Sequence, residues 1–144
     1  MKAIIFDMDG TLADVNPIRH YVSGDKKDFN SFHKASVWVR PNQQILALNH
    51  AINDQVAILI VTARNEQFRT VTSAWLEKYQ VRYHHLYMRK SGDNRADYLV
   101  KQDIFKQITT AGYNVVAAVD DNPNIIALWK EMQLVVIEVP GFSG

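Results

Sequence analysis

Cysteine is absent from the 144 residues of this chain. Its absence excludes a disulfide framework, a thiolate nucleophile and a cysteine-ligated zinc site, and it fits a reducing compartment. Long apolar runs are also missing, since no stretch approaches the ~20 residues that a membrane-spanning helix needs. The amino-terminal segment MKAIIFDMDG carries acids where a signal peptide would stay apolar. We therefore expect an intracellular, cytoplasmic protein without membrane contact.

Neither sign of charge dominates, because the formal net charge is only +1. A balance so close to neutrality gives no support by itself for nucleic-acid or membrane binding. Hydrophobic residues make up 47% and charged residues 22% of the sequence, as in globular proteins. The length fits one ordinary domain, so we expect residues 1–144 to form a single domain with one core.

Short apolar runs rich in β-branched residues predict the buried strands of a parallel sheet. The clear runs, with a weaker fifth candidate named last, are Ala3–Phe6, Val56–Val61, Val115–Val119, Val135–Val139 and Tyr83–Tyr87. Between them, apolar residues recur at helical spacing and predict helices with buried faces. These groups are Ile45, Leu48 and Ile52; Phe68, Val71, Trp75 and Tyr79; Val100, Ile104 and Ile108; and Ile125, Trp129 and Met132. The alternation predicts an α/β fold with a mainly parallel five-stranded sheet.

The segment Ala13–Arg40 interrupts this alternation. It is polar, rich in Asp, Lys and His, and weakly periodic. Because it is long for a loop in a compact domain, we expect either a functional insertion or a mobile segment.

Aspartates gather where two of the predicted strands end. Asp7 and Asp9 stand two residues apart in IIFDMDGTL, and Asp120 and Asp121 follow the Val115–Val119 run. Ligands of open α/β sheets sit beyond the carboxyl ends of the strands, so adjacent strands would bring all four carboxylates together. Such a cluster needs a cation, because like charges repel. Mg²⁺ prefers oxygen ligands and is commonly shared with a substrate phosphate, so the cluster predicts a magnesium site.

Other metals fit less well. The histidines are scattered along the sequence, and Gly10 is fourth from Asp7 rather than sixth as in a calcium-binding EF-hand. The same residues also allow ordinary structural roles. These are a turn at Asp7–Gly10, a helix cap at Asp121 or Asn122, a helix cap or strand end at Thr62, and a solvated charge at Lys101. Their joint order along strands and helices favours a functional site.

The segment FDMDGTL resembles the first motif of the haloacid dehalogenase superfamily, hydrophobic-Asp-x-Asp-Gly-Thr. Thr62 resembles its second motif, Lys101 its third and Asp120-Asp121 its fourth, in the right order along the chain. The resemblance implies a Rossmannoid three-layer α/β/α sandwich. Residues 13–40 are too few for a large cap domain, so the implied cap insert is minimal and the site open.

A second resemblance lies in MRKSGDNRADYLVKQDIF, residues 88–105. It is similar to the lysine-motif region in the phosphatase domain of phage polynucleotide kinases, which carries an arginine, Gly-Asp-x-Arg-x-Asp and Val-Lys. The matching residues are Arg89, Gly92, Asp93, Arg95, Asp97 and Lys101. Thr62-Ala63-Arg64 resembles the family's Ser/Thr-Gly-Arg, and Asn122-Pro123 stand where an arginine often follows the aspartate pair. The sequence has no G-x-x-x-x-G-K-[ST] kinase loop.

The resemblance assigns catalytic roles to the aspartates. A carboxylate is a competent nucleophile toward phosphorus, and Asp7 would form an aspartyl-phosphate. Asp9 would act first as general acid and then as general base. The implied ligands of Mg²⁺ are Asp7, the backbone carbonyl of Asp9, and either Asp120 or Asp121, which the sequence does not distinguish.

Further residues would bind the substrate. Thr62 offers a hydroxyl and Lys101 a charge to the phosphoryl oxygens. Gly10 and Thr11 would shape the tight turn that leaves the site. Three arginines near the motifs, which can either follow a nucleic-acid backbone or balance the acids, are Arg64, Arg89 and Arg95.

Three functions stay open at this point. The first is a magnesium-dependent phosphatase acting on the 3′-phosphate ends of nucleic acid, a bulky substrate that suits an open site. The second is the same chemistry on a nucleotide or sugar phosphate, and the third is a binding module without catalysis. The resemblance to phage enzymes suggests a phage or bacterial origin. Aromatic candidates for base stacking are limited to Tyr21, Phe29 and Phe32.

Overall fold

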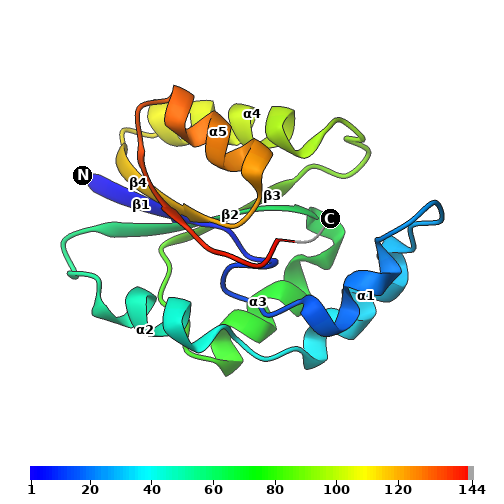
Figure 1. The fold of residues 1–144 in the computed structure, drawn as a ribbon. Coiled ribbons are helices and arrows are strands. Elements are labelled where there is room, and N and C mark those ends of the chain that lie inside the picture. The colour runs from blue at the N-terminus through cyan, green and yellow to red at the C-terminus, as the bar shows by residue number, and fades with distance from the viewer. Residues whose placement is uncertain (143–144) are drawn as a thin grey trace.

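Five parallel strands form the centre of the protein in the computed structural model, which describes residues 1–142. The sheet order is β3-β2-β1-β4-β5 (Figure 1). The strands are β1 (Lys2–Phe6), β2 (Ala57–Asn65), β3 (His85–Arg89), β4 (Asn114–Asp120) and β5 (Val135–Glu138). Each pair of neighbours is parallel, as the apolar, β-branched composition of the runs predicted.

Helices cover both faces of this sheet. The helices α2 (Gln43–Ala51) and α3 (Arg69–Lys78) lie on one face, and α4 (Asp97–Thr110) and α5 (Pro123–Glu131) lie on the other (Figure 1). Alternate residues of β2 supply both cores: Ile58 and Ile60 pack on one side, Leu59 and Val61 on the other. The α/β/α sandwich expected from the sequence is therefore confirmed, and all four predicted helices are present.

The strand order reverses beside β1. The chain runs from β1 outward through β2 to β3, then crosses to the other side of β1 to form β4 and β5. Such a reversal opens a crevice beyond the carboxyl ends of the two strands that flank it, here β1 and β4. Asp7 and Asp120 stand at these two ends.

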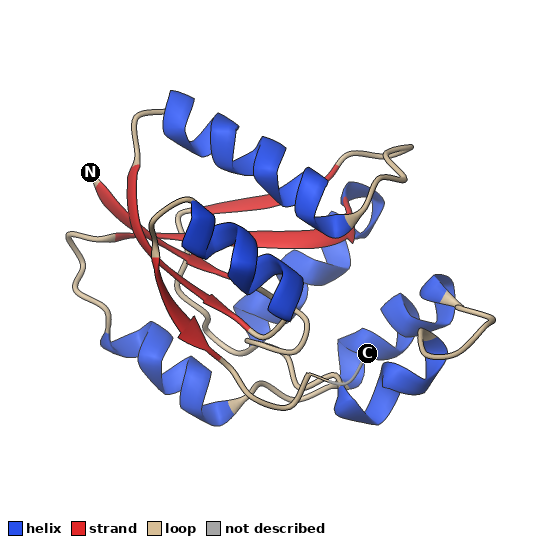
Figure 2. Cartoon of the chain, turned by 45° about the horizontal axis from the view of Figure 1, so that its top comes forward, coloured by secondary structure: helices blue, strands red, loops and turns tan. Residues whose placement is uncertain are grey.

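Residues 13–40 form a folded insertion, which we call the insert. It contains the 3₁₀ helix η1 (Asn16–Tyr21), the helix α1 (Phe29–Ala35) and the 3₁₀ turn η2 (Ser36–Trp38). Asp28 caps α1 by accepting a hydrogen bond from the Ser31 amide at 3.0 Å. These short elements lie together at one end of the molecule (Figure 2). Of the two expectations for this segment, the structure supports the insertion.

The strand predicted as buried at Val135–Val139 is instead a partly exposed edge strand. Val135 is 68% and Ile137 41% exposed, because β5 pairs with β4 alone. A second prediction was wrong at Val71, which is 37% exposed although its spacing placed it in the buried stripe of α3. The buried residues of α3 are Thr72, Trp75 and Leu76.

Strand boundaries differ from the prediction most in β2 and β3, and by one residue at one or both ends of the other strands. The strand β2 continues beyond Val61 to Asn65, so Thr62 and Arg64 are part of it rather than following it. The strand β3 begins at His85, two residues later than the predicted run Tyr83–Tyr87. None of the helices within residues 1–142 combines the length and apolar character needed to cross a bilayer.

Candidate active site

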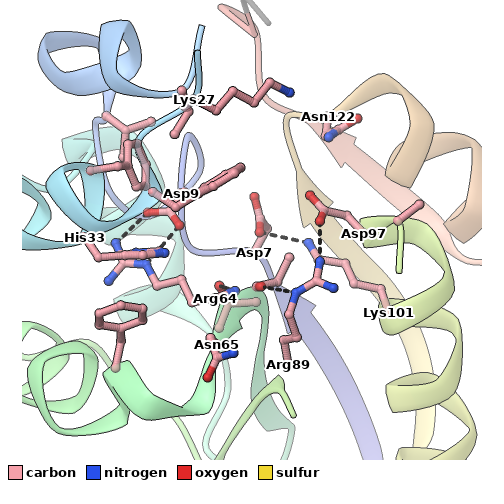
Figure 3. A pocket seen from close by; sticks show the side chains of 18 of the residues that line it. Asp7, Asp9, Lys27, His33, Arg64, Asn65, Arg89, Asp97, Lys101 and Asn122 are labelled. Atoms are coloured by element: carbon pink, nitrogen blue, oxygen red, sulfur yellow. Dashed lines mark hydrogen bonds and ion pairs between the residues drawn. The ribbon is translucent and has the colours of Figure 1, made fainter. Parts of the chain in front are cut away.

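Three carboxylates meet at the carboxyl ends of β1 and β4. The Asp7 amide donates to the Val119 carbonyl at 3.0 Å, which fixes the end of β1 against β4. Asp7, Asp120 and Asp121 are all buried, and each offers an oxygen within 4.8 Å of the others. Adjacent strands thus bring together three of the four aspartates predicted to converge. The Asp9 carboxylate instead turns toward β2 (Figure 3).

A buried lysine stands between two of these acids. Lys101 comes from the inner face of α4, and its Nζ lies 2.9 Å from Asp7 Oδ1 and 3.3 Å from Asp120 Oδ2. Burial alone would lower the pKa of Lys101, but the charges of Asp120 and Asp7 raise it above its ordinary value. Burial and repulsion by Asp120 raise the pKa of Asp7 well above its ordinary value, against the opposing effect of Lys101. One lysine therefore only partly neutralises the cluster.

The two neighbouring aspartates of the fourth motif have different environments. Asp120 is fully buried and accepts four hydrogen bonds. Its Oδ1 accepts from the amides of Asp121 and Asn122, and its Oδ2 accepts from Lys101 and from the Trp129 indole at 3.2 Å. Asp121, by contrast, lines the cavity described below.

The turn after β1 is packed tightly against Asp121. The Thr11 hydroxyl lies 3.1 Å from Asp7 Oδ2 and 3.4 Å from Asp121 Oδ1, and it has one proton to share between them. Gly10 has φ +85°, and a Cβ there would overlap Asp121 Oδ2 and come within 2.9 Å of Arg19 Nη2. Gly10 and Thr11, predicted as substrate-binding, therefore shape the loop that positions the acids.

Asp9 is held by Arg64 from β2. The Arg64 Nε donates to Asp9 Oδ2 at 2.9 Å, and its Nη2 donates to Oδ1 at 2.5 Å. The third branch of the guanidinium, Nη1, donates to the buried Thr72 hydroxyl at 3.2 Å. Burial would raise the pKa of Asp9, but the charge and hydrogen bonds of Arg64 hold it below its ordinary value. Asp9 is thus an ionised carboxylate in this arrangement.

Thr62 lies one strand over from Asp7, at the wall of the cavity. It is 1% exposed, and its Oγ1 accepts a hydrogen bond from the Arg64 amide at 3.1 Å. Since the hydroxyl acts there as an acceptor, its own hydrogen can still be donated. The register of β2 with β3 shifts between Val61 and Asn65, so Thr62 lies in an irregular part of the strand pairing.

Arg89, predicted to contact substrate, is engaged within the protein. Its Nε donates to the Ala63 carbonyl at 2.9 Å, and its Nη1 donates to the carbonyls of Asp93 and Arg95 at 2.9 and 2.7 Å. Its Nη2 pairs with Asp97 at 2.6 Å (Figure 3). Arg89 therefore fixes the loop between β3 and α4 against the end of β2.

Arg95 is also committed to nearby acids, although it lines the cavity. Its guanidinium pairs with Asp93 at 2.8 Å and with Asp103 at 2.6 Å. The balancing role that the sequence left open for the arginines thus matches the observed contacts of Arg89 and Arg95.

A cavity of about 700 Å³ opens onto the acids. One wall comes from the insert, and it brings in residues that sequence reasoning did not propose for the site: Arg19, Lys27 and His33. Arg19 Nη2 lies 3.3 Å from Asp121 Oδ2. No spacing or motif in the irregular Ala13–Arg40 segment signalled these residues, and the folding of the insert alone places them here.

His33 is a buried residue of this wall. Its ring lies 4.2 Å from the Phe68 ring, and its Nδ1 has no hydrogen-bond partner among residues 1–142. Burial and the charge of Arg64 lower its pKa to about 4, against the opposing charge of Asp9. His33 is therefore neutral at physiological pH.

The fold and the cluster together define a class of protein. A parallel sheet with Asp-x-Asp at its first strand end, a threonine on the next strand, a buried lysine and a following aspartate pair is the arrangement of a haloacid dehalogenase-type phosphatase. The chain belongs to the family described as the polynucleotide kinase PNKP phosphatase domain, whose family model matches residues 1–141.

Similar proteins agree with this assignment. A protein of Autographa californica nuclear polyhedrosis virus, named a bifunctional polynucleotide kinase/RNA ligase, is 27% identical over 135 residues, or 92% of this chain. A chain in the solved structure of a Pnkp1/Rnl/Hen1 complex superimposes with a TM-score of 0.82 at 26% identity, over 96% of this chain. A haloacid dehalogenase-like hydrolase from Streptococcus pneumoniae shares the fold, with a TM-score of 0.66 at 15% identity over 94% of this chain and 83% of its own.

The first two relatives are much longer. This chain spans 18% of the viral protein and 45% of the matched chain in the Pnkp1/Rnl/Hen1 complex.

Proposed function

We propose that this phosphatase removes 3′-phosphates from nucleic-acid ends, uses Mg²⁺, and forms an aspartyl-phosphate on Asp7. The observation that carries the proposal is the position of Asp7, whose carboxylate reaches the cavity between Lys101 and Thr11. Membership of the polynucleotide kinase phosphatase family supports the choice of substrate.

The first chemical step forms a bond between a carboxylate oxygen of Asp7 and phosphorus, while the bond from phosphorus to the ester oxygen breaks. The leaving oxygen takes a proton from Asp9. In the second step Asp9 accepts a proton from water, and the water oxygen displaces Asp7 from phosphorus to release phosphate. Lys101 and the Thr62 hydroxyl stabilise charge on the phosphoryl oxygens.

The residues present fit a magnesium ion. The carboxylates of Asp7, Asp120 and Asp121 lie close enough to share one ion. Its proposed ligands are Asp7, Asp121 and, from the family resemblance, the backbone carbonyl of Asp9. We assign Asp121 rather than Asp120, because Asp120 is saturated by four donors whereas Asp121 faces the cavity. When bound, Mg²⁺ neutralises the phosphate and offsets the repulsion among the acids. Asp120 then acts by orienting Lys101.

Asp9 has to change partners during this cycle. Paired with Arg64 it is ionised, which suits the proton acceptor of the second step. To donate a proton in the first step it must bind one and separate from Arg64. The ion pair in Figure 3 is therefore the arrangement of Asp9 as a base.

The relatives suggest a setting for the reaction. The names of the viral and structural relatives include kinase, ligase and RNA repair functions. We propose that this phosphatase acts inside the cell and prepares nucleic-acid ends for kinase and ligase activities. Those activities would reside either in the same polypeptide or in a partner protein.

A substrate panel tests the function. Oligonucleotides with 3′- or 5′-phosphates, mononucleotides and sugar phosphates are compared with and without Mg²⁺. Preference for the 3′-phosphorylated oligonucleotide in the presence of Mg²⁺ supports the proposal. Preference for a mononucleotide or sugar phosphate would support the small-molecule alternative, for which the cavity has room.

The nucleophile is tested separately. Asp7→Asn keeps the size of the side chain but removes the nucleophile, so a folded variant should lose turnover on every substrate. Normal turnover would refute the aspartyl-phosphate. Inactivity of the wild-type protein on the whole panel would favour the non-catalytic binding module.

A further inference from the structure

We propose that the insert recognises the terminal nucleotide, with Phe29 stacking on its base and Lys27 contacting the neighbouring phosphate. This inference rests on the proposed 3′-phosphatase function and adds the residues that hold the nucleic acid. It assigns the binding of the rest of the substrate to the insert, since the carboxylates act on the phosphate and Arg89 and Arg95 pair within the protein.

The cavity is larger than the reacting phosphate requires. It extends from Asp7 and Asp121 to the insert, and its volume of about 700 Å³ falls in the range of sites that take whole small-molecule ligands. The space beyond the phosphate is bounded on the insert side by Lys27, Phe29 and His33. A group attached to the phosphate therefore meets the insert.

Phe29 is the aromatic residue of this wall that is open to a ligand. It begins α1 and is 55% exposed while lining the cavity. Phe32 also lines it but is 6% exposed and belongs to the core, and Tyr21 does not line it. An exposed phenylalanine offers a π-face to any base, which gives affinity without sequence preference. Phe29 is thus the stacking platform that the sequence could not select from three candidates.

Lys27 provides a charge that the protein does not use. It lines the cavity and forms no ion pair with residues 1–142. Arg89 and Arg95, in contrast, are bound to carboxylates. In Figure 3 Lys27 extends from the insert along the edge of the cavity. A cation at this position complements the phosphate next to the terminal nucleotide.

The stacking contact is tested with Phe29→Ala and a matched control, Trp38→Ala. Trp38 belongs to the same insert and is 81% exposed, but it does not line the cavity. For Phe29→Ala we expect kcat/KM on a 3′-phosphorylated oligonucleotide to fall about 5-fold to 100-fold, the range that stacking of one base supports. The loss should be much smaller on p-nitrophenyl phosphate, and on an oligonucleotide with an abasic 3′-terminal residue. Phe29→Trp should restore activity, and Trp38→Ala should retain it.

The phosphate contact is tested with Lys27→Ala against Lys26→Ala, a neighbouring lysine that does not line the cavity. Loss of one phosphate contact should weaken oligonucleotide binding and reduce the slope of log K against log salt by about 1. For Lys26→Ala, the reduction in the slope of log K against log salt should be smaller than for Lys27→Ala.

The outcomes separate this inference from the proposed function. If the wild-type enzyme hydrolyses small phosphates but no nucleic-acid 3′-phosphate, both fail. If it acts on the oligonucleotide, and Phe29→Ala loses the same factor on p-nitrophenyl phosphate or nothing at all, the stacking role fails alone. An unchanged salt slope in Lys27→Ala removes the phosphate contact.

Discussion

Arg64 on β2 donates hydrogen bonds to both carboxylate oxygens of Asp9, at 2.9 and 2.5 Å. The strand β2 lies next to β1, which the Asp7-Met8-Asp9 motif follows. The ion pair keeps Asp9 ionised and out of the carboxylate cluster formed by Asp7, Asp120 and Asp121. A bidentate arginine pair is one of the stronger side-chain interactions in proteins. In this arrangement Arg64 therefore holds Asp9, the proposed acid–base residue, away from Asp7, the proposed nucleophile.

Asp9→Asn should reduce turnover by about 10²- to 10⁴-fold on an alkyl phosphate, because general acid catalysis contributes that much. The loss should be smaller on p-nitrophenyl phosphate, whose leaving group needs less protonation. The measurement is kcat on both substrates, with Asp14→Asn, an exposed acid near the same motif, as the control. Equal losses on both substrates would argue against Asp9 as the proton donor.

Asp121→Asn and Asp120→Asn should fail in different ways. Asp121→Asn should raise the Mg²⁺ concentration needed for half-maximal activity by at least about tenfold, since even indirect partners of a metal matter that much. Asp120→Asn should instead lower stability, because Asp120 accepts four hydrogen bonds in the interior. Metal titration of activity and urea unfolding distinguish the two. The reverse pattern would make Asp120 the ligand.

Gly10→Ala should destabilise the protein more than Gly112→Ala. Both glycines have positive φ, +85° and +97°, so both variants introduce backbone strain that typically costs more than ~1 kcal/mol. Only at Gly10 does the new Cβ overlap another side chain, that of Asp121, whereas no atom lies within 4 Å of the Gly112 position. The difference between the two variants in the loss of unfolding free energy, measured with urea, gives the cost of the overlap. Equal destabilisation would mean that Asp121 moves aside without cost.

His33 should make stability depend on pH between about 4 and 6.5. Its pKa is lowered to about 4 in the folded state, so the unfolded chain binds the proton first. Stability from the neutral ring is present above pH 6.5 and is lost as the pH falls toward 4, by about 1–2 kcal/mol once solvent screening is allowed for. Urea unfolding at several pH values measures this slope.

His33→Phe is the comparison that isolates the histidine. Asp7, whose pKa is raised, contributes with the opposite sign and is present in both proteins. The fall in stability from pH 6.5 to 4 should therefore be smaller in the variant. An identical pH dependence would show that His33 gains its proton without cost.

The sequence by itself determined the fold class and the family. Apolar β-branched runs alternating with helical patterns are typical of a covered parallel sheet, and the four motifs in order carried the resemblance to the family. The roles of nucleophile, acid–base residue and phosphate-binding lysine follow from that resemblance and stay predictions. These features are local patterns, so they can be read along the chain. The same local reading misjudged Val135, Ile137 and Val71, because exposure depends on whether a neighbouring element covers the residue.

The tertiary structure decided which of these residues face the cavity and which bind other parts of the protein. Only the packing of α4 and α5 against the end of β4 showed that Asp120 is buried among four donors while Asp121 faces the cavity. Only the folded insert brought Arg19, Lys27, Phe29 and His33 to the site, since they lie in an irregular segment without periodicity. Likewise, the sequence could not tell whether Arg64, Arg89 and Arg95 meet substrate or protein. Contacts between residues as far apart as Asp9 and Arg64 depend on the packing of strands, which no local pattern encodes.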